Sequence, residues 1–340
     1  MGNPAVFYHP SFLEHETGEH PESKERLVVA RQVLLDSGLH VEWVTPDPAP
    51  VSAIARVHDP AHIEFIRETA EKGGDWLDWD TVVSPGSYEA ALLAAGSGLT
   101  AVDRCLAGGQ LAFMLVRPPG HHACRSRGMG FCLFNNIAVA AAHALEERGL
   151  ERILIFDWDV HHGNGTQAAF YDDPRVLFFS THQRNHYPGT GLAGEIGAGD
   201  GTGYTVNVPL RAGASDGAIL LVFESLLAPL VRAYNPQIVL VSAGYDSQEG
   251  DPLGGLRLSE PAFQWMAARL VALAQEVGAA GPLCFLEGGY VPRRLAASIV
   301  STLRGLGGEA PAFDRPISSD ERADVAEALH LARPHWEDAL

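Results

Sequence analysis

Two short apolar segments, each followed within a few residues by acidic side chains, constrain the fold of this chain most strongly. Residues 152–157 are followed by Asp159 and His161, and residues 237–242 are followed by Asp246. Apolar runs of this length are typical of strands that are buried on both faces of a parallel sheet. Ligands of such sheets bind beyond the carboxyl ends of the strands. The two segments therefore predict one cleft in which Asp159, His161 and Asp246 meet.

Helix and strand patterns alternate along the rest of the chain, which has 340 residues. Further strands are expected at residues 5–8, 111–116, 176–180, 205–208 and 282–286, and helices at residues 20–38, 84–106, 136–148, 216–234, 259–277 and 292–306. This alternation predicts an α/β fold in which helices cover both faces of a mainly parallel sheet, a three-layer αβα arrangement. No linker or repeat divides the sequence, so we expect a single domain over residues 1–340. Its tail, from about residue 307, should pack on the surface with one short helix near 320–332.

The composition narrows the classes of function. The formal net charge is −18, which argues against nucleic-acid binding because a phosphate backbone needs clustered Lys and Arg. The acidity is compatible with attraction of a cationic substrate, and equally with simple solubility. No segment reads as a membrane span, and the first residues lack the basic and apolar regions of a secretory signal. None of the four cysteines forms a Cys-x-x-Cys pair, so we expect reduced thiols in a cytoplasmic protein.

Asp159, His161 and Asp246 form a candidate metal site of two carboxylates and one imidazole. Catalytic zinc sites use three protein ligands and keep a fourth position for water. The set therefore predicts one bound Zn²⁺, although Fe²⁺ or Co²⁺ can occupy such ligands too. The alternative is that the acids only cap the helices that follow. Two acids and two histidines within eight residues, from 157 to 164, make that alternative weaker.

A second group of candidate residues follows the strand at 111–116, in the sequence Arg-Pro-Pro-Gly-His-His. Adjacent His121 and His122 on a loop stiffened by proline suit proton transfer, because imidazole titrates near neutrality. Asp157 is expected to orient His121, and Asn164 to orient His162 as a neutral acceptor. The two oriented histidines should then differ in basicity. Taken alone, the pair of histidines would read as a surface turn.

Glu-Gly-Gly-Tyr at 287–290 also follows a predicted strand. The two glycines allow the backbone to bring the hydroxyl of Tyr290 close to the metal site. A phenol in that place donates a hydrogen bond to a developing oxyanion. Most tyrosines in such loops are packing residues, so this motif is weak without the others.

Four motifs together carry a specific resemblance. In chain order they are Arg-Pro-Pro-Gly-His-His, Asp-x-Asp-x-His-His-Gly-Asn-Gly-Thr, Gly-Tyr-Asp and Gly-Gly-Tyr, each after a predicted strand. The chain resembles the metal-dependent histone deacetylase superfamily, which includes bacterial histone deacetylase-like amidohydrolases and acetylpolyamine amidohydrolases. The resemblance runs from about residue 9 to residue 300. Asn164 and the Gly-Thr after it are similar to the class II branch.

The resemblance implies an arginase/deacetylase-like fold and a role for each matching residue. Asp159, His161 and Asp246 match the zinc ligands, and Tyr290 matches the tyrosine that stabilises the transition state. The paired catalytic histidines match His121 and His122, with Asp157 and Asn164 as their partners. The substrate channel matches Gly130, Phe131, Tyr187 and Leu253. A structural K⁺ site near the zinc matches Asp157, Asp159, His161, Ser180 and Thr181, and a second K⁺ site matches Phe170, Asp173, Val176 and Tyr204.

The implied activity is hydrolysis of an N-acylated amine, with acetyl-lysine side chains as the expected substrate. Acetylpolyamines remain an alternative: Leu253 lacks the negative charge of a polyamine gate, but the early acids Glu14, Glu16, Glu19 and Glu22 could narrow the entrance or simply be solvated surface. Arg26 is expected near an internal acetate path or in a surface salt bridge. A non-catalytic acyl-amine binder is the alternative of another class. A dimer or a tetramer is compatible with the resemblance.

The arginase type, which shares a similar fold and uses two manganese ions, is the nearest enzymatic rival. Its pattern places further aspartates at two positions that are Gly163 and Gly244 in this chain. Two ligands for a second metal are therefore missing, and the sequence favours a site for one ion.

Overall fold

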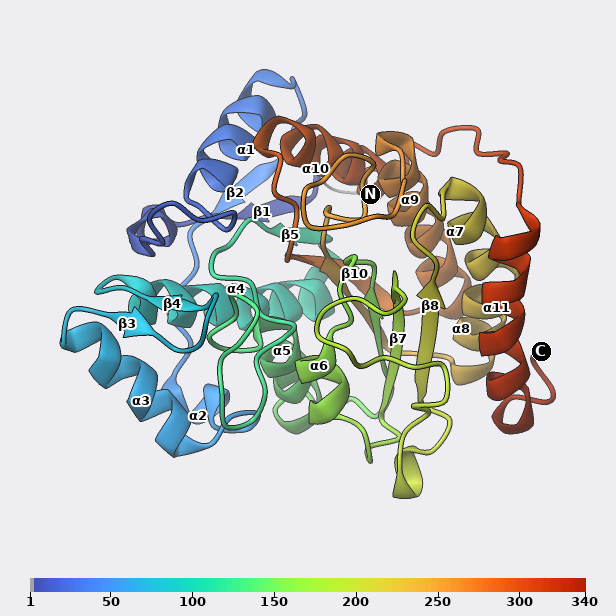
Figure 1. Ribbon diagram of the computed structural model, residues 1–340, viewed down its shortest axis with the longest axis horizontal. Coiled ribbons are helices and arrows are strands. Elements are labelled where there is room, and N and C mark those ends of the chain that lie inside the picture. The colour runs from blue at the N-terminus through green and yellow to red at the C-terminus, as the bar shows by residue number, and fades with distance from the viewer. Residues whose placement is uncertain (1–2) are drawn as a thin grey trace.

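The computed structural model describes residues 3–340, and its centre is one sheet of eight parallel strands (Figure 1). The predicted α/β architecture is confirmed. In spatial order the strands are β2 (Glu42–Val44), β1 (Ala5–Phe7), β5 (Ala112–Met114), β10 (Ala280–Leu286), β9 (Ile238–Ala243), β6 (Ile153–Asp157), β7 (Val176–Gln183) and β8 (Thr205–Leu210). A separate antiparallel hairpin, β3 (Asp75–Trp76) and β4 (Val82–Val83), lies outside this sheet.

The central strands are buried because their side chains are apolar on both faces. Every residue of β6 and of β9 is buried, as expected for strands that helices cover on each side. The register aligns Asp157 at the end of β6 with Ser242 of β9 and with Ser180 of β7. Strands β5, β10, β9 and β6 are consecutive in the sheet, so the loops that follow them emerge side by side at one edge.

Helices cover both faces of the sheet (Figure 1). On one face α10 (Pro292–Leu306) packs against α1 (Glu25–Asp36) and α9 (Glu260–Val277), and on the other α4 (Ser87–Gly108) packs against α5 (Asn136–Glu146). The remaining helices are α2 (Val51–Ile54), α3 (Pro60–Glu71), α6 (Asn164–Ala169), α7 (Asp216–Val222), α8 (Ala228–Tyr234) and α11 (Ser319–Ala332).

Two expected helices differ from the structure. The first begins at Glu25 rather than near His20, because Glu22 turns inward to a buried ion pair with Arg117. The helix expected over 216–234 is interrupted by a π-helical turn at Phe223–Leu227. Proline at 229 has no N–H to donate within the helix, which is a common cause of such a break. Strand β2, helices α2, α3 and α6, and the hairpin were not predicted from the sequence.

The tail of the chain packs on the edge of the sheet. Helix α11 contacts β8 and α7 (Figure 1), and it begins with a capping box in which Ser318 and Glu321 satisfy each other's backbone N–H groups. Residues 87–108 and 216–234 are long and apolar enough to cross a membrane, but 67% and 61% of these windows are buried within the fold. Core helices have the same properties, so the expectation of no membrane span stays a prediction.

Candidate metal centre and active site

Asp159, His161 and Asp246 meet at the carboxyl ends of β6 and β9. All three are buried, and one potential ligand atom of each lies within 4.8 Å of the others. Within residues 3–340, this is the one cluster of three or more His, Cys, Asp or Glu side chains that could hold a metal ion. His161 Nδ1 is 3.1 Å from Asp159 Oδ1 and 3.1 Å from Asp246 Oδ2. Burial and the Asp159 charge raise the pKa of Asp246 to about 7. A buried carboxylate whose charged form is opposed by a second carboxylate in this way favours a bound cation.

Glycines make room for these carboxylates. A Cβ at position 244 would lie 1.9 Å from Asp159 Oδ2, and a Cβ at position 288 would lie 2.0 Å from Asp246 Oδ2. The backbone N–H of Gly288 instead donates to Asp159 Oδ2 at 2.8 Å, and that of Val160 donates to Asp246 Oδ1 at 3.0 Å. The carboxylates are therefore held in fixed orientations. Two carboxylates and an imidazole so arranged fit a divalent ion of the zinc type.

The adjacent histidines have unlike partners, as predicted. His121 Nδ1 is 3.0 Å from Asp157 Oδ2, and His122 Nδ1 is 2.7 Å from Asn164 Oδ1. Burial opposes the charge on both rings, but Asp157, Asp159 and the nearby carboxylate of residue 287 raise the pKa of His121 to about 10. For His122, burial and the positive charge of its neighbours hold the pKa well below its usual value. These shifts favour the protonated form of His121 and the neutral form of His122, in which one ring nitrogen can accept a proton.

The assignment of Asn164 to His162, made from the local sequence, was wrong, whereas the pairing of Asn164 with the His121–His122 motif that the resemblance implied is confirmed. His162 contacts Thr190 Oγ1 at 2.8 Å and Gln167 Oε1 at 2.9 Å instead. Asn164 reaches His122 because the first turn of α6 packs on the histidine loop: the N–H of Gly165 donates to the carbonyl of His121 at 3.0 Å. This packing joins segments that are about 40 residues apart, so the local sequence does not reveal it.

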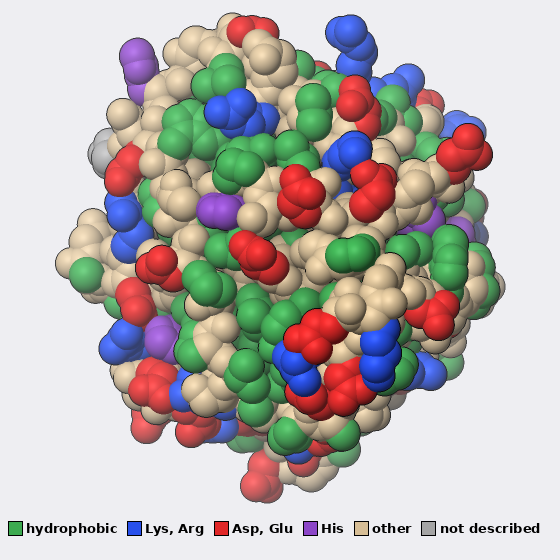
Figure 2. All heavy atoms as spheres, turned by 90° about the vertical axis from the view of Figure 1, so that its left-hand side faces the viewer, with side chains coloured by type: hydrophobic (Ala, Val, Ile, Leu, Met, Phe, Trp, Pro, Cys, Tyr) green, Lys and Arg blue, Asp and Glu red, His purple; other side chains and the backbone are tan. Residues whose placement is uncertain are grey.

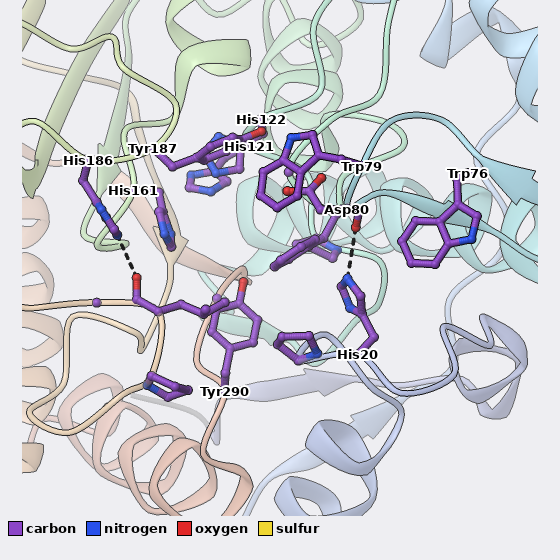
Figure 3. Close-up of a pocket in the computed structure, with 18 residues that line it drawn as sticks. His20, Trp76, Trp79, Asp80, His121, His122, His161, His186, Tyr187 and Tyr290 are labelled. Carbon is purple, nitrogen blue, oxygen red and sulfur yellow. Dashed lines mark hydrogen bonds between the residues drawn. The ribbon is translucent and has the colours of Figure 1, made fainter.

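Tyr290 approaches the cavity from the side opposite the two histidines (Figure 3). Its backbone N–H donates to Asp251 Oδ2 at 2.7 Å, and the guanidinium of Arg26 lies 5.0 Å from the centre of its ring. Burial, with the charge of Asp246 as a further cause, raises the pKa of the phenol well above its usual value. The hydroxyl therefore keeps its proton and can act as a hydrogen-bond donor.

Arg26 is buried rather than in a surface salt bridge. Its Nε donates to the carbonyl of Gly289 at 2.7 Å, its Nη1 donates to Glu22 at 3.0 Å, and its Nη2 donates to the carbonyl of Glu287 at 2.5 Å. Glu22 also binds Arg117 in a fully buried pair. The expectation of solvated surface was therefore wrong for Glu22, whereas the other three early acids, at positions 14, 16 and 19, are exposed.

Glu287 is a site residue that the sequence reasoning missed. Its Oε2 accepts the backbone N–H groups of Gly120 at 2.7 Å and of His121 at 3.1 Å. The buried carboxylate thereby fixes the histidine loop to the end of β10. The available signal was an acid that directly ends an apolar strand, the same signal that pointed to Asp157.

A cavity of about 560 Å³ opens above this cluster, and it contains all four predicted channel residues (Figure 3). The rings of Phe131 and Tyr187 form part of its walls. Gly130 is needed there because a Cβ would lie 2.4 Å from the His122 ring, and its φ is +56°. Further lining residues that were not predicted are His20, Trp76, Trp79, Asp80 and His186. The sequence Asp-Trp-Leu-Asp-Trp-Asp at 75–80 was the signal that could have found three of them.

The residues of the two predicted K⁺ sites lie in two neighbouring regions. Asp157 pairs in register with Ser180, whose hydroxyl contacts His182 Nδ1 at 2.9 Å. In the loop before β7, the N–H of Val176 donates to the carbonyl of Asp173 at 3.3 Å, and that of Asp173 donates to the carbonyl of Phe170. The N–H of Phe178 donates to the carbonyl of Tyr204, the fourth residue of the second set. K⁺ binding stays a prediction for both sets.

The arginase-type alternative is disfavoured by packing. A Cβ at position 163 would lie 2.3 Å from Asp157 Oδ2, and position 244 is tighter still. Neither position has space for the extra aspartates that a second metal would need. The absence of those acids is therefore built into the backbone geometry.

Residues 20–306 match the family model of the histone deacetylase domain. Histone deacetylase 10, chloroplastic, of rice (Oryza sativa subsp. japonica) is 38% identical over 94% of this chain and 78% of its own length. Histone deacetylase-like amidohydrolase of Pseudomonas aeruginosa is 38% identical over 88% of this chain and 79% of its own. The human polyamine deacetylase HDAC10 is 38% identical over 99% of this chain and 53% of its own. The crystal structure of the HDA15 HD domain superposes with a TM-score of 0.92 at 33% identity, covering 100% of this chain and 97% of that one. This chain belongs to the histone deacetylase family of amide-hydrolysing enzymes.

Proposed function

We propose that this enzyme is a zinc-dependent amidohydrolase that removes acetyl or related short acyl groups from N-acylated amines, with acetyl-lysine side chains as the leading substrate. The observation that carries the proposal is the buried set of two carboxylates and one imidazole at the foot of the cavity, flanked by His122 and Tyr290. A divalent ion held by Asp159, His161 and Asp246 would polarise the amide carbonyl and lower the pKa of the attacking water.

The side chains around the triad divide the proton transfers between them. Because Nδ1 of His122 faces Asn164, its Nε2 is the base that takes a proton from the attacking water and later gives it to the leaving amine. His121, held as a cation by Asp157, stabilises the negative charge that develops. The hydroxyl of Tyr290 donates a hydrogen bond to the oxygen of the substrate carbonyl as that oxygen becomes negative.

The position of Leu253 supports acetyl-lysine over an acetylpolyamine. Leu253 lines the cavity, and its backbone carbonyl accepts a hydrogen bond from His186 at 2.8 Å. An apolar side chain there provides no charge to select a distant ammonium. Acetylpolyamine hydrolysis is the second candidate, supported by the human relative, which is named a polyamine deacetylase, and by one aspartate, Asp80, in the lining of the cavity.

Turnover of a defined panel tests the proposal. Zinc-loaded protein should release acetate from an acetyl-lysine peptide, and protein treated with a chelator should not. The Asp246→Asn variant provides a matched control because it removes one ligand charge and little volume. If the metal-loaded protein released no acetate from either acetyl-lysine or acetylpolyamine substrates, the proposal would be contradicted. The remaining hypothesis would then be a non-catalytic protein that binds acylated amines.

A further inference from the structure

The hairpin β3–β4 presents two exposed tryptophans at the mouth of the cavity. Trp76 is 54% exposed and Trp79 is 78% exposed, the highest value for a large hydrophobic side chain within residues 3–340. Both nevertheless line the cavity above the metal triad. Figure 2 shows the side of the molecule that carries this hairpin and α3, where hydrophobic and acidic side chains lie next to each other. Burial in the fold does not explain why indole rings occupy these positions.

Trp79 is the second aromatic ring outward from the metal triad. The ring of Tyr187 lies 6.0 Å from that of His161 and 5.1 Å from that of His122. The ring of Trp79 lies 6.4 Å from that of Tyr187 (Figure 3). A substrate whose amide reaches the triad would therefore pass its aliphatic chain along Tyr187 and bring its next functional group to Trp79.

The same hairpin carries carboxylates that no cation neutralises. Asp78 Oδ1 accepts the backbone N–H groups of Asp80 at 3.1 Å and of Thr81 at 2.9 Å, which fixes the tip of the hairpin. Within the described chain, 3–340, neither Asp78 nor Asp80 forms an ion pair with Lys or Arg, whereas surface acids elsewhere do so, as in α3 with Arg67. Burial, and then the proximity of Asp78, raise the pKa of Asp80 to about 6. Asp80 lines the cavity together with Trp79, so its carboxylate would attract a cation placed there.

We propose that Trp79 and Asp80, which both line the cavity, form a subsite for a positively charged ammonium that the substrate carries a few methylenes beyond the scissile amide. This inference rests on the proposed function and names a substrate feature for it. The face of an indole is the best aromatic partner for a cation, and the nearby carboxylates add direct attraction. The ammonium comes either from the rest of a polyamine or from a basic side chain next to an acetyl-lysine.

Matched substrates separate these two sources. The first series compares N-acetyl diamines of increasing length with neutral N-acetyl alkylamines of the same length. The second series compares acetyl-lysine peptides that carry Lys or norleucine beside the acetylated residue. We expect kcat/KM to be about 10-fold higher for the charged member of at least one series, mostly through KM, because the subsite adds binding energy far from the reacting bond.

Two variants of the zinc-loaded enzyme test the subsite. Trp79→Leu keeps an apolar side chain and removes the ring, and Asp80→Asn removes the charge but keeps an oxygen that can accept the hydroxyl of Thr81. Each should reduce the preference for the charged member to about 2-fold. Trp43→Leu, at an exposed tryptophan of the edge strand β2, and Asp36→Asn, on α1, should leave the preference unchanged.

The outcomes distinguish this inference from the function on which it rests. A preference for charged diamines identifies the polyamine source, and a preference for charged peptides identifies the basic peptide. If acetate is released with no charge preference, or with a preference that both variants retain, the subsite is wrong and the amidohydrolase stands. If the wild-type enzyme releases no acetate from any member, the proposed function itself fails.

Discussion

At the scale of single residues, the site depends on small differences between similar neighbours. His121 and His122 are adjacent and both buried, yet one faces the carboxylate of Asp157 and the other the amide of Asn164. A carboxylate stabilises the charged ring and an amide does so only weakly. One position therefore holds a positive charge while the other remains able to accept a proton.

Replacing Asn164 with Asp should make the two histidines alike. A carboxylate beside His122 Nδ1 would raise the pKa of that ring, so a larger fraction would be protonated at neutral pH and unable to act as a base. The rising limb of kcat/KM against pH should move to higher pH. Measurement of that profile for the zinc-loaded variant tests the assignment, and an unshifted limb would show that His122 is not the base.

Removing the hydroxyl of Tyr290 should slow the chemical step. Tyr290→Phe keeps the ring against Arg26 and deletes one donor to the developing oxyanion, which in enzymes of other families lowers kcat by about 10²- to 10³-fold. Steady-state kinetics would show the loss in kcat with KM little changed. Activity within a few-fold of wild type, at equal zinc content, would remove Tyr290 from the mechanism.

At the scale of elements, strand ends and helix starts position the site. The ends of β6 and β9 supply the metal triad, the end of β5 leads into the histidine loop, and the end of β10 leads to Tyr290. Hydrogen bonds from backbone N–H groups connect these loops. One example is the N–H of Gly288, which donates to the carboxylate of Asp159. A change in one loop is therefore expected to reach the others.

A single methyl group at the end of β9 should destroy the metal site. In Gly244→Ala the new Cβ would overlap Asp159 Oδ2, at 1.9 Å, and the carboxylate would have to leave its position. We expect loss of stoichiometric zinc by metal analysis after dialysis. Gly108→Ala, at the end of α4 with no atom within 4 Å of the added carbon, is the control and should bind zinc normally.

The contact between His58 and the start of α5 should make stability depend on pH. His58 Nδ1 donates to the carbonyl of Cys124 at 2.9 Å, and Nε2 accepts the N–H of Asn135 at 2.8 Å. Burial, with His62 as a further cause, lowers the pKa of His58 to about 4. Between that value and its ordinary pKa the unfolded state binds more protons, so stability falls as pH falls, by about 3 kcal/mol in total.

Unfolding in urea at several pH values from 7 to 4 tests this contribution. His58→Gln cannot titrate, so its free energy of unfolding should decrease less steeply over this range than that of the wild type. The slope of His40→Gln, at an exposed position, should match the wild type. Equal slopes for all three proteins would contradict the assignment.

At the scale of the whole molecule, a metal ion is expected to add stability to a fold that already concentrates negative charge at its centre. The ligands come from strands separated by about 80 residues, so the triad exists only in the folded state. A ligand that binds only this state stabilises it by mass action, by about 4 kcal/mol when free zinc exceeds its Kd 1,000-fold. Thermal unfolding should show a higher Tm with zinc than with chelator. The Asp246→Asn variant should lose this increase in Tm, and the control variant Asp36→Asn should keep it. An equal increase in both variants would show that zinc binds at another site.

The sequence by itself determined the fold class and identified the three residues of the candidate metal site, which the structure brings together. Both are encoded locally: an apolar run of strand length buries itself in a parallel sheet, and the acids just after it must lie at the sheet edge. The same argument found the histidine loop and Tyr290, since each follows its own strand. The eight-stranded parallel sheet of the structure agrees with this prediction.

Only the tertiary structure decided which distant groups meet. Asn164 contacts His122 rather than His162 because α6 packs on the histidine loop, and Glu22 is buried because Arg117 lies behind it. Trp79 and its hairpin line the cavity, although the sequence around Trp79 has no strand pattern that would predict this position. Hydrophobic periodicity and strand ends indicate whether a segment is buried and where it ends. Contacts between distant residues depend instead on how separate segments pack against each other. Many such packings are compatible with the same local pattern.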